Sequence, residues 1–181
     1  MMFVLTPILP SRALVAVAAT LCALMIPAVL AQTTVRIVAL GASNTEGWGL
    51  APEHAYPVRL QDLLKAKGVD AAVANAGIAG DTTRSMLGRL EDAVPAGTRL
   101  VILQPGTNDE RIGLGAERAA NIAKMRSLLA ARNINLIVIE NAVLDALPRT
   151  ELRDDGIHFT PAGYGMLAER ILPDVLATLG Q

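Results

Sequence analysis

The chain is poor in cysteine, in aromatic residues and in any excess of charge. Its single cysteine, Cys22, lies in an apolar stretch near the N-terminus, so the rest of the chain has no thiol for a disulfide bond or for thiol chemistry. The 16 basic and 17 acidic residues nearly balance, and neither sign forms a long run. This balance argues against the basic surface of a nucleic-acid-binding protein and against an acidic solvated tail.

Two further patterns are missing from the sequence. No group of His, Cys, Asp and Glu residues has the spacing of a metal site. The glycine-containing stretch 41–49 has neither the lysine of a P-loop nor the glycine spacing of a dinucleotide-binding turn. We therefore expect no metal and no cofactor.

The first 31 residues contain one charged side chain, Arg12, followed by a nearly unbroken apolar run from Ala13 to Leu30. Short residues one and three places before Gln32 complete the pattern of a signal peptide cleaved after Ala31. We expect residues 1–31 to be removed and residues 32–181 to form one domain, periplasmic or secreted and without a stable membrane anchor. The alternative is an uncleaved N-terminal helix that anchors the protein, because the run is about long enough to span a bilayer.

Beyond residue 31, short apolar runs alternate with segments of helical periodicity. The runs predict strands over residues 35–40, 70–75, 100–103 and 136–139. The periodic segments predict helices over residues 56–67, 83–94, 117–132 and 161–179, the last one preceded by a capping Thr160. This alternation predicts a parallel sheet with helices on both faces, a flavodoxin-like three-layer α/β sandwich, in which the second strand is followed across the sheet by the first, third and fourth. Residues 141–153 are too few for a helix and a full fifth strand, so the sheet has four good strands and at most a rudimentary fifth.

Candidate functional residues follow each predicted strand. Ser43 comes after the first strand, Gly80 after the second, Asn108 after the third, and Asp155 with His158 after the fourth. Because ligands of open parallel sheets bind beyond the carboxyl ends of the strands, we expect these residues to meet at one edge.

Together they supply what a serine acyl hydrolase needs. A serine hydroxyl becomes an effective nucleophile when a base takes its proton, and His158 can be that base, with Asp155 orienting the imidazole. The N–H groups of Ser43 and Gly80 and the side-chain amide of Asn108 can bind the oxyanion of a tetrahedral intermediate.

These four segments resemble, in the same order, the four sequence blocks of the SGNH hydrolases, also called GDSL hydrolases. The blocks are Gly41-Ala42-Ser43, residues 75–82 with Gly80, Gly106-Thr107-Asn108-Asp109, and Asp155-Gly156-Ile157-His158. The resemblance covers essentially all of residues 32–181 and is strongest to small bacterial acyl-CoA thioesterase I, lysophospholipase and arylesterase-like enzymes. It implies hydrolysis of small-molecule acyl esters or thioesters, such as short acyl esters, a lysophospholipid or an acyl-CoA, through an acyl-enzyme at Ser43.

The sequence departs from the family pattern at two places. Ala42 stands where the family usually has an aspartate that braces the nucleophile loop, and the segment before Asp155 is shorter than usual, which predicts an open pocket that lacks a substrate-lining helix or loop. Two alternatives remain open: a polysaccharide O-deacetylase, and a non-catalytic binding pseudoenzyme of the same fold.

Several nearby residues have competing interpretations. Trp48 either lines the substrate pocket or is a packing anchor. His54 is expected to be structural, Asp109 to brace a turn, and Asp154 to be a surface charge beside Asp155. The alternative to an oxyanion-binding role for Asn108 is a structural one, in which its side chain hydrogen-bonds within its own turn, as asparagine often does.

Overall fold

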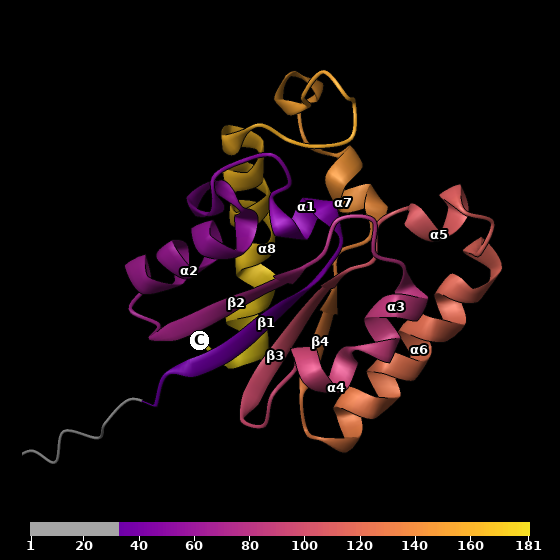
Figure 1. Cartoon of the computed structure of the whole chain (residues 1–181). Helices are drawn as coiled ribbons and strands as arrows, with labels where there is room; N and C mark the ends of the chain where they lie inside the picture. The colour runs from indigo at the N-terminus through magenta and orange to yellow at the C-terminus, as the bar shows by residue number, and fades with distance from the viewer. Residues whose placement is uncertain (1–32) are drawn as a thin grey trace, which may run out of the picture. The chain divides into compact units, whose positions relative to one another are not determined.

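The computed structural model describes residues 33–181. The expected signal peptide, its cleavage site and the alternative membrane anchor therefore lie outside the described residues. The described chain contains a sheet of four parallel strands in the order β2-β1-β3-β4 (Figure 1). The strands are β1 (Val35–Gly41), β2 (Ala71–Gly77), β3 (Thr98–Gln104) and β4 (Asn135–Val138). The predicted α/β fold and strand order are confirmed.

The register of the central strands brings three strand ends to the same level. Gly41 at the end of β1 pairs with Gly77 of β2 on one side and with Gln104 of β3 on the other. The segments that follow these strands, which carry Ser43, Gly80 and Asn108, therefore leave the sheet side by side. Figure 1 shows three short helices beyond this edge: α1 (Ser43–Glu46), α5 (Asn108–Arg111) and α7 (Asn141–Asp145).

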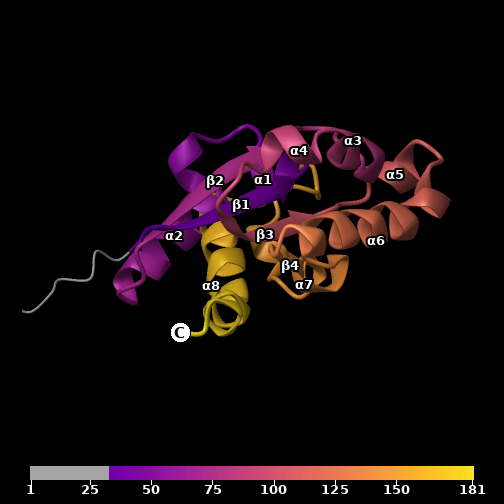
Figure 2. The ribbon, with the colours of Figure 1, turned by 90° about the horizontal axis from the view of Figure 1, so that it is seen from below.

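Helices cover both faces of the sheet, with β1 and β3 lying between α8 and α4 in the view of Figure 2. One face is covered by α2 (Tyr56–Ala66) and α8 (Pro161–Leu179). The other is covered by α3 (Thr83–Gly88), α4 (Leu90–Ala93) and α6 (Gly115–Ala131). Thr160 caps α8 by accepting a hydrogen bond from the Gly163 N–H, as its place before Pro161 predicts.

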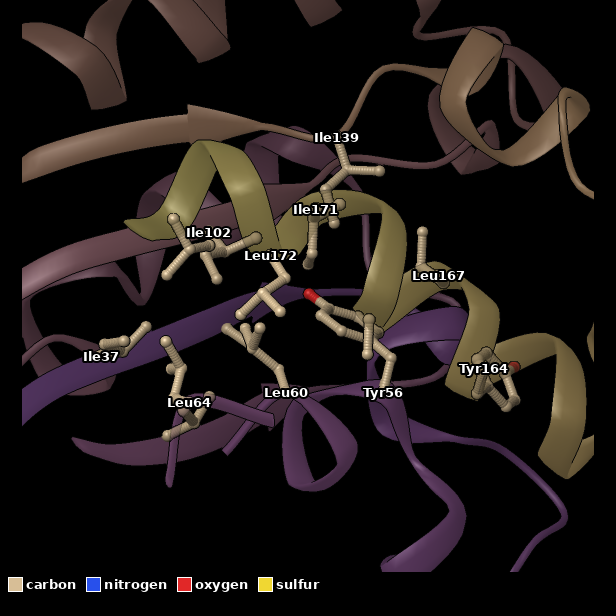
Figure 3. Close-up of a cluster of buried hydrophobic side chains, with 14 of the residues drawn as sticks. Ile37, Tyr56, Leu60, Leu64, Ile102, Ile139, Tyr164, Leu167, Ile171 and Leu172 are labelled. Atoms are coloured by element: carbon tan, nitrogen blue, oxygen red, sulfur yellow. The ribbon is translucent and has the colours of Figure 1, made fainter. Parts of the chain in front are cut away.

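Alternating residues of β1 supply the two hydrophobic cores. Ile37 and Ala39 point to the α2 and α8 side, whereas Val38 and Leu40 point to the α3, α4 and α6 side. Figure 3 shows the first core, in which side chains of α2, such as Leu60, pack against those of α8, such as Ile171. Burying each of these large side chains contributes about 1.5–3 kcal/mol, so the two cores hold the strand ends rigidly in place.

The structure differs from the sequence-based expectation in its short elements. The helix predicted over residues 83–94 is interrupted at Arg89, whose backbone angles of φ −102° and ψ 10° separate α3 from α4. Glycine is a weak helix former, and Gly88 precedes the break. The one-turn helices α1, α5 and α7 and the 3₁₀ turns η1 (Pro52–His54) and η2 (Arg149–Glu151) were not predicted, because a single turn has no periodicity to detect.

The rudimentary fifth strand is a single antiparallel bridge between Leu152 and Phe159, outside the four-stranded sheet. Within residues 33–181, no helix combines the length and the apolar character needed to cross a bilayer.

Candidate active site

The turn after β1 presents Ser43 as the first residue of α1, directly after Ala42. The first N–H groups of a helix have no partner inside it, so the Ser43 N–H is free of α1's own hydrogen bonds. The turn requires glycine at position 41. A Cβ there would lie 2.1 Å from Thr45 Oγ1 and 2.8 Å from the Gln104 carbonyl oxygen.

Ser43 and Asn108 line the same cavity, which has a volume of about 320 Å³. The end of β3 contributes Gln104 to its lining, and the region of α7 and η2 contributes an apolar wall that includes Leu144, Leu147, Leu152 and Phe159. The expectation that the short segment 141–153 leaves the pocket without a lining helix or loop is therefore wrong. Its one-turn elements are enough to place three leucines on the cavity wall.

Asp155 and His158 form a direct pair. Asp155 Oδ2 lies 2.7 Å from His158 Nδ1, and Asp155 Oδ1 accepts the N–H groups of Ile157 and His158 at 2.9 Å each. The backbone N–H of His158, its imidazole and the N–H of Ile157 hold the pKa of Asp155 well below its usual range. An ionised carboxylate can only accept, so Nδ1 carries the proton and Nε2 is the free basic nitrogen. The neighbouring Asp154 is exposed and is not part of this pair.

The loop that carries this pair is closed at its base. Arg153 N–H donates to the His158 carbonyl at 2.8 Å, and the Thr160 N–H donates to the Glu151 carbonyl at 2.8 Å. These bonds flank the Leu152–Phe159 bridge and join the loop to the start of α8. Asp155 and His158 are thus held three residues apart on one tight loop.

The structure does not join Ser43 to His158. Within residues 33–181, His158 Nε2 is buried and has no hydrogen-bond partner. Hydrogen bonds between a nucleophile and its base are often long in ligand-free structures and shorten when substrate binds. The structure therefore brings Asp155 and His158 into contact but shows no hydrogen bond from His158 to Ser43. Ser43 lines the cavity together with Ile157 of the same loop, whereas Asp155 and His158 are absent from the lining.

Asn44, which sequence reasoning did not single out, links the nucleophile helix to the Asp155–His158 loop. Its Oδ1 accepts from the hydroxyl of Tyr164 on α8 at 2.9 Å, and its Nδ2 donates to the Ile157 carbonyl at 3.4 Å. Burial raises the pKa of Tyr164 to about 12, so its hydroxyl keeps the proton that it donates. No sequence signal identified this link, because it joins residues 120 positions apart.

Trp48 lies against the imidazole of His158 rather than in the cavity lining. The two rings have centroids 4.9 Å apart and planes tilted by 37°. Arg153 holds the tryptophan by donating from Nη1 to its carbonyl oxygen at 2.8 Å, with the guanidinium 5.9 Å from the ring centroid. Trp48 is 47% exposed, whereas the His158 that it contacts is buried. Of its two predicted roles, the structure favours packing.

Gly80 and Asn108 are connected through Asp81. Gly80 has a φ of 79°, which favours glycine, in a turn closed by the Asp81 N–H and the Ile78 carbonyl at 3.1 Å. Asn108 Nδ2 donates to the Asp81 carbonyl at 2.8 Å, which leaves the second N–H of that amide for another acceptor. Asn108 therefore braces the Gly80 turn, and not its own turn as the alternative interpretation held.

Asp109 braces the start of a distant helix and not its own turn, which differs from the role expected for it. Its buried carboxylate accepts from the Thr83 N–H at 3.0 Å and from Thr83 Oγ1 at 2.5 Å, at the start of α3. His54 lies at the end of η1, with Nδ1 3.3 Å from Arg59 Nη2, and is absent from the cavity lining. Among the described residues, no three His, Cys, Asp or Glu side chains are placed to hold a metal ion.

Comparison with known proteins agrees with this arrangement. Residues 39–151 match the GDSL-like lipase/acylhydrolase family. The chain belongs to this family. The matched region includes Ser43, Gly80 and Asn108 and ends before the Asp155–His158 pair, so the geometry of that pair is separate support for the resemblance first seen in the sequence.

This GDSL-like chain is 32% identical to an arylesterase of Vibrio mimicus over 111 residues, which are 60% of this chain and 56% of that protein. The match thus spans about half the length of the relative. Among solved structures, it is similar to AlinE4, an SGNH-hydrolase family esterase, with a TM-score of 0.55 and 27% identity over 82% of this chain and 74% of that one. It shares its fold with TesA, with a TM-score of 0.69 and 24% identity over 79% of this chain and 99% of that one.

Proposed function

We propose that this protein is a serine hydrolase that cleaves acyl esters or thioesters through an acyl-enzyme at Ser43. The observation that carries the proposal is the Asp155–His158 pair, whose imidazole Nε2 has no hydrogen-bond partner among the described residues. The loop that holds this pair contributes Gly156 and Ile157 to the cavity that Ser43 lines. Its family membership and its similarity to an arylesterase and an esterase support the same reaction.

The proposed reaction has two halves. Ser43 Oγ attacks the acyl carbonyl while His158 Nε2 takes the hydroxyl proton and then gives it to the leaving alcohol or thiol. Water, activated by the same imidazole, releases the acid from the acyl-enzyme. The N–H groups of Ser43 and Gly80 and the remaining N–H of the Asn108 amide stabilise the oxyanion of each tetrahedral intermediate.

The cavity favours a substrate with a small acyl group. Its volume of about 320 Å³ lies near the lower end of the range for ligand pockets, about 300–1,000 Å³. The leucines and Phe159 in its lining suit a hydrocarbon chain, whereas Arg111 and Arg149, which also line the cavity, offer cationic groups. A short acyl chain joined to a polar or anionic leaving group fits both sets of residues.

A panel of p-nitrophenyl esters of increasing acyl length, extended with an acyl-CoA and an O-acetylated polysaccharide, tests the proposal. We expect kcat/KM to be highest for short acyl esters and to fall as the chain outgrows the cavity. Absence of turnover on every member of the panel would contradict the proposed activity. A preference for the polysaccharide would favour the deacetylase alternative.

We also propose that the protein is exported and that its mature form begins at Gln32. The support is the apolar run that ends at Ala31, directly before the first residues of the folded domain. Intact-mass measurement of protein recovered from the periplasm or medium is expected to give the mass of residues 32–181, with or without cyclisation of Gln32. A mature protein that retains Met1 or Met2 would favour the membrane-anchored alternative.

The substitution Ala42→Asp separates an enzyme from a pseudoenzyme. Ala42 is 3% exposed and packs in the second hydrophobic core, so a carboxylate there must be buried at a cost. In a working enzyme we expect kcat/KM on a short ester to change little or to fall. A wild type without measurable turnover, beside an Ala42→Asp variant that is at least about tenfold more active, would show that the missing aspartate had silenced the site.

A further inference from the structure

Arg89 lies at the break in a helix, and its side chain reaches the carboxyl ends of β1 and β2. It lies between α3 and α4, and its side chain is only 20% exposed. Its partner Asp81, directly after Gly80, has a side chain that is 7% exposed. A mostly buried pair of charges is stable only where its remaining hydrogen-bonding groups are satisfied.

The guanidinium makes four contacts with three different segments. Its Nε and Nη2 lie 2.8 Å and 2.7 Å from Asp81 Oδ2. Nη2 also donates to the Ala76 carbonyl at 2.8 Å and to the Gly41 carbonyl at 3.2 Å. One side chain thus bonds the end of β1, the end of β2 and the turn that follows β2.

These segments carry the proposed oxyanion donors. Gly41 is two residues before Ser43, and Asp81 is one residue after Gly80. On its other side, the Asp81 carbonyl accepts the Asn108 amide. Each donor is therefore close to the Arg89–Asp81 pair. Ser43 is two residues from a carbonyl that Arg89 binds, Gly80 is next to Asp81, and the Asn108 amide is hydrogen-bonded to Asp81. The methyl group of Ala42 cannot accept a hydrogen bond, so that residue's side chain adds no polar brace to the nucleophile turn.

We propose that Arg89 is a positioning residue that fixes the separation of the Ser43 and Gly80 N–H groups, an inference that rests on the proposed hydrolase function. A guanidinium suits this task because its donors form a rigid planar fork, whereas a lysine ammonium is a single point charge on a flexible stem. Donors aimed at an oxyanion act on the transition state and not on the bound ester. We therefore expect the loss of Arg89 to lower kcat and to leave KM nearly unchanged.

The substitution Arg89→Lys tests this role while keeping the positive charge beside Asp81. We expect kcat to fall about 10- to 100-fold, because a displacement of about 1 Å at reacting groups has an effect of that size. KM is expected to stay within about twofold, since ground-state binding is unchanged. The matched control is Arg84→Lys on α3, five positions before Arg89. Among the described residues Arg84 pairs with Glu117 alone, in an exposed ion pair, so we expect no change in either constant.

Three further readouts separate positioning from a structural role. Affinity for an alkylboronic acid, which forms a tetrahedral adduct, is expected to fall by the same factor as kcat, at a temperature where circular dichroism shows each variant fully folded. Millimolar guanidinium is expected to raise the kcat of Arg89→Ala and to leave that of Ser43→Ala unchanged. Hydrogen exchange of peptides covering residues 41–45 and 77–82 is expected to be faster in Arg89→Lys than in Arg84→Lys.

An unchanged kcat in Arg89→Lys would overturn the inference, whatever the exchange rates. A loss of activity that merely follows the unfolded fraction, without guanidinium rescue, would overturn it as well. If the wild type hydrolyses no ester, the proposed function fails separately, and the exchange measurement alone decides: equal exchange in the two lysine variants overturns the positioning role, whereas faster exchange of both loops in Arg89→Lys supports it.

Discussion

Replacing Ser43 with alanine is expected to lower kcat for ester hydrolysis by about 10³- to 10⁶-fold, because loss of a triad nucleophile has effects of this size. The reason is chemical: without Oγ, no acyl-enzyme forms, and His158 has no hydroxyl to deprotonate. The loss of one hydroxyl on the half-buried Ser43 removes little packing, so the midpoint of thermal unfolding is expected to stay close to that of the wild type.

The measurement compares kcat/KM and thermal unfolding of Ser43→Ala, wild type and Ser127→Ala. Ser127 lies exposed on α6 and is absent from the cavity lining, so its replacement controls for the loss of a hydroxyl as such. Near-wild-type turnover in folded Ser43→Ala would show that another group is the nucleophile.

The substitution Asp155→Asn is expected to reduce kcat by about 10³- to 10⁴-fold with a small change in KM, in line with the loss of a triad carboxylate in other serine hydrolases. An amide at position 155 can donate to Nδ1, which favours the imidazole tautomer with its proton on Nε2. That tautomer cannot accept a proton from Ser43. The matched control is Asp154→Asn, which changes an exposed neighbour and is expected to leave turnover unaffected. Equal turnover in the two asparagine variants would contradict the assignment of Asp155.

The same residue predicts a dependence of stability on pH. The hydrogen bonds from His158 and Ile157 hold the pKa of Asp155 below its usual value. The ionised carboxylate is therefore more stable in the folded protein than in the unfolded chain. The resulting stabilisation is present above the unfolded pKa of about 3.9 and is lost as the pH falls through the lower folded value. Thermal unfolding followed from pH 6 downward is expected to show a smaller loss of stability below about pH 4 in Asp155→Asn than in wild type. Parallel curves would contradict this.

The regular part of the fold follows from the sequence because its signals are periodic. Short apolar runs such as residues 100–103 favour buried strands, and their alternation with amphipathic helices leaves few topologies for a parallel sheet. The break at Arg89 was not predictable, because the apolar spacing of residues 83–94 continues across it. At the break, Arg89 donates hydrogen bonds to strand ends that are distant in the sequence, and no local pattern marks these contacts.

The candidate site was predictable to the extent that it is local in sequence. The three-residue spacing of Asp155 and His158 places both on one loop, and the pair is formed in the structure. The roles of Asn44, Tyr164 and Arg89 were not predictable, because their partners come from other segments and no residue pattern marks them. The same holds for Trp48, whose contact with His158 depends on how two loops meet.

Labelling with a fluorophosphonate tests the central claim most directly, because the probe reacts with activated serine hydroxyls and its adduct can be located. Intact mass followed by peptide mapping is expected to show one adduct, on the peptide that contains Ser43, formed slowly in Asp155→Asn and not at all in Ser43→Ala. An adduct on any other residue, or an esterase-active preparation that takes up no label, would contradict the account of Ser43 as the nucleophile.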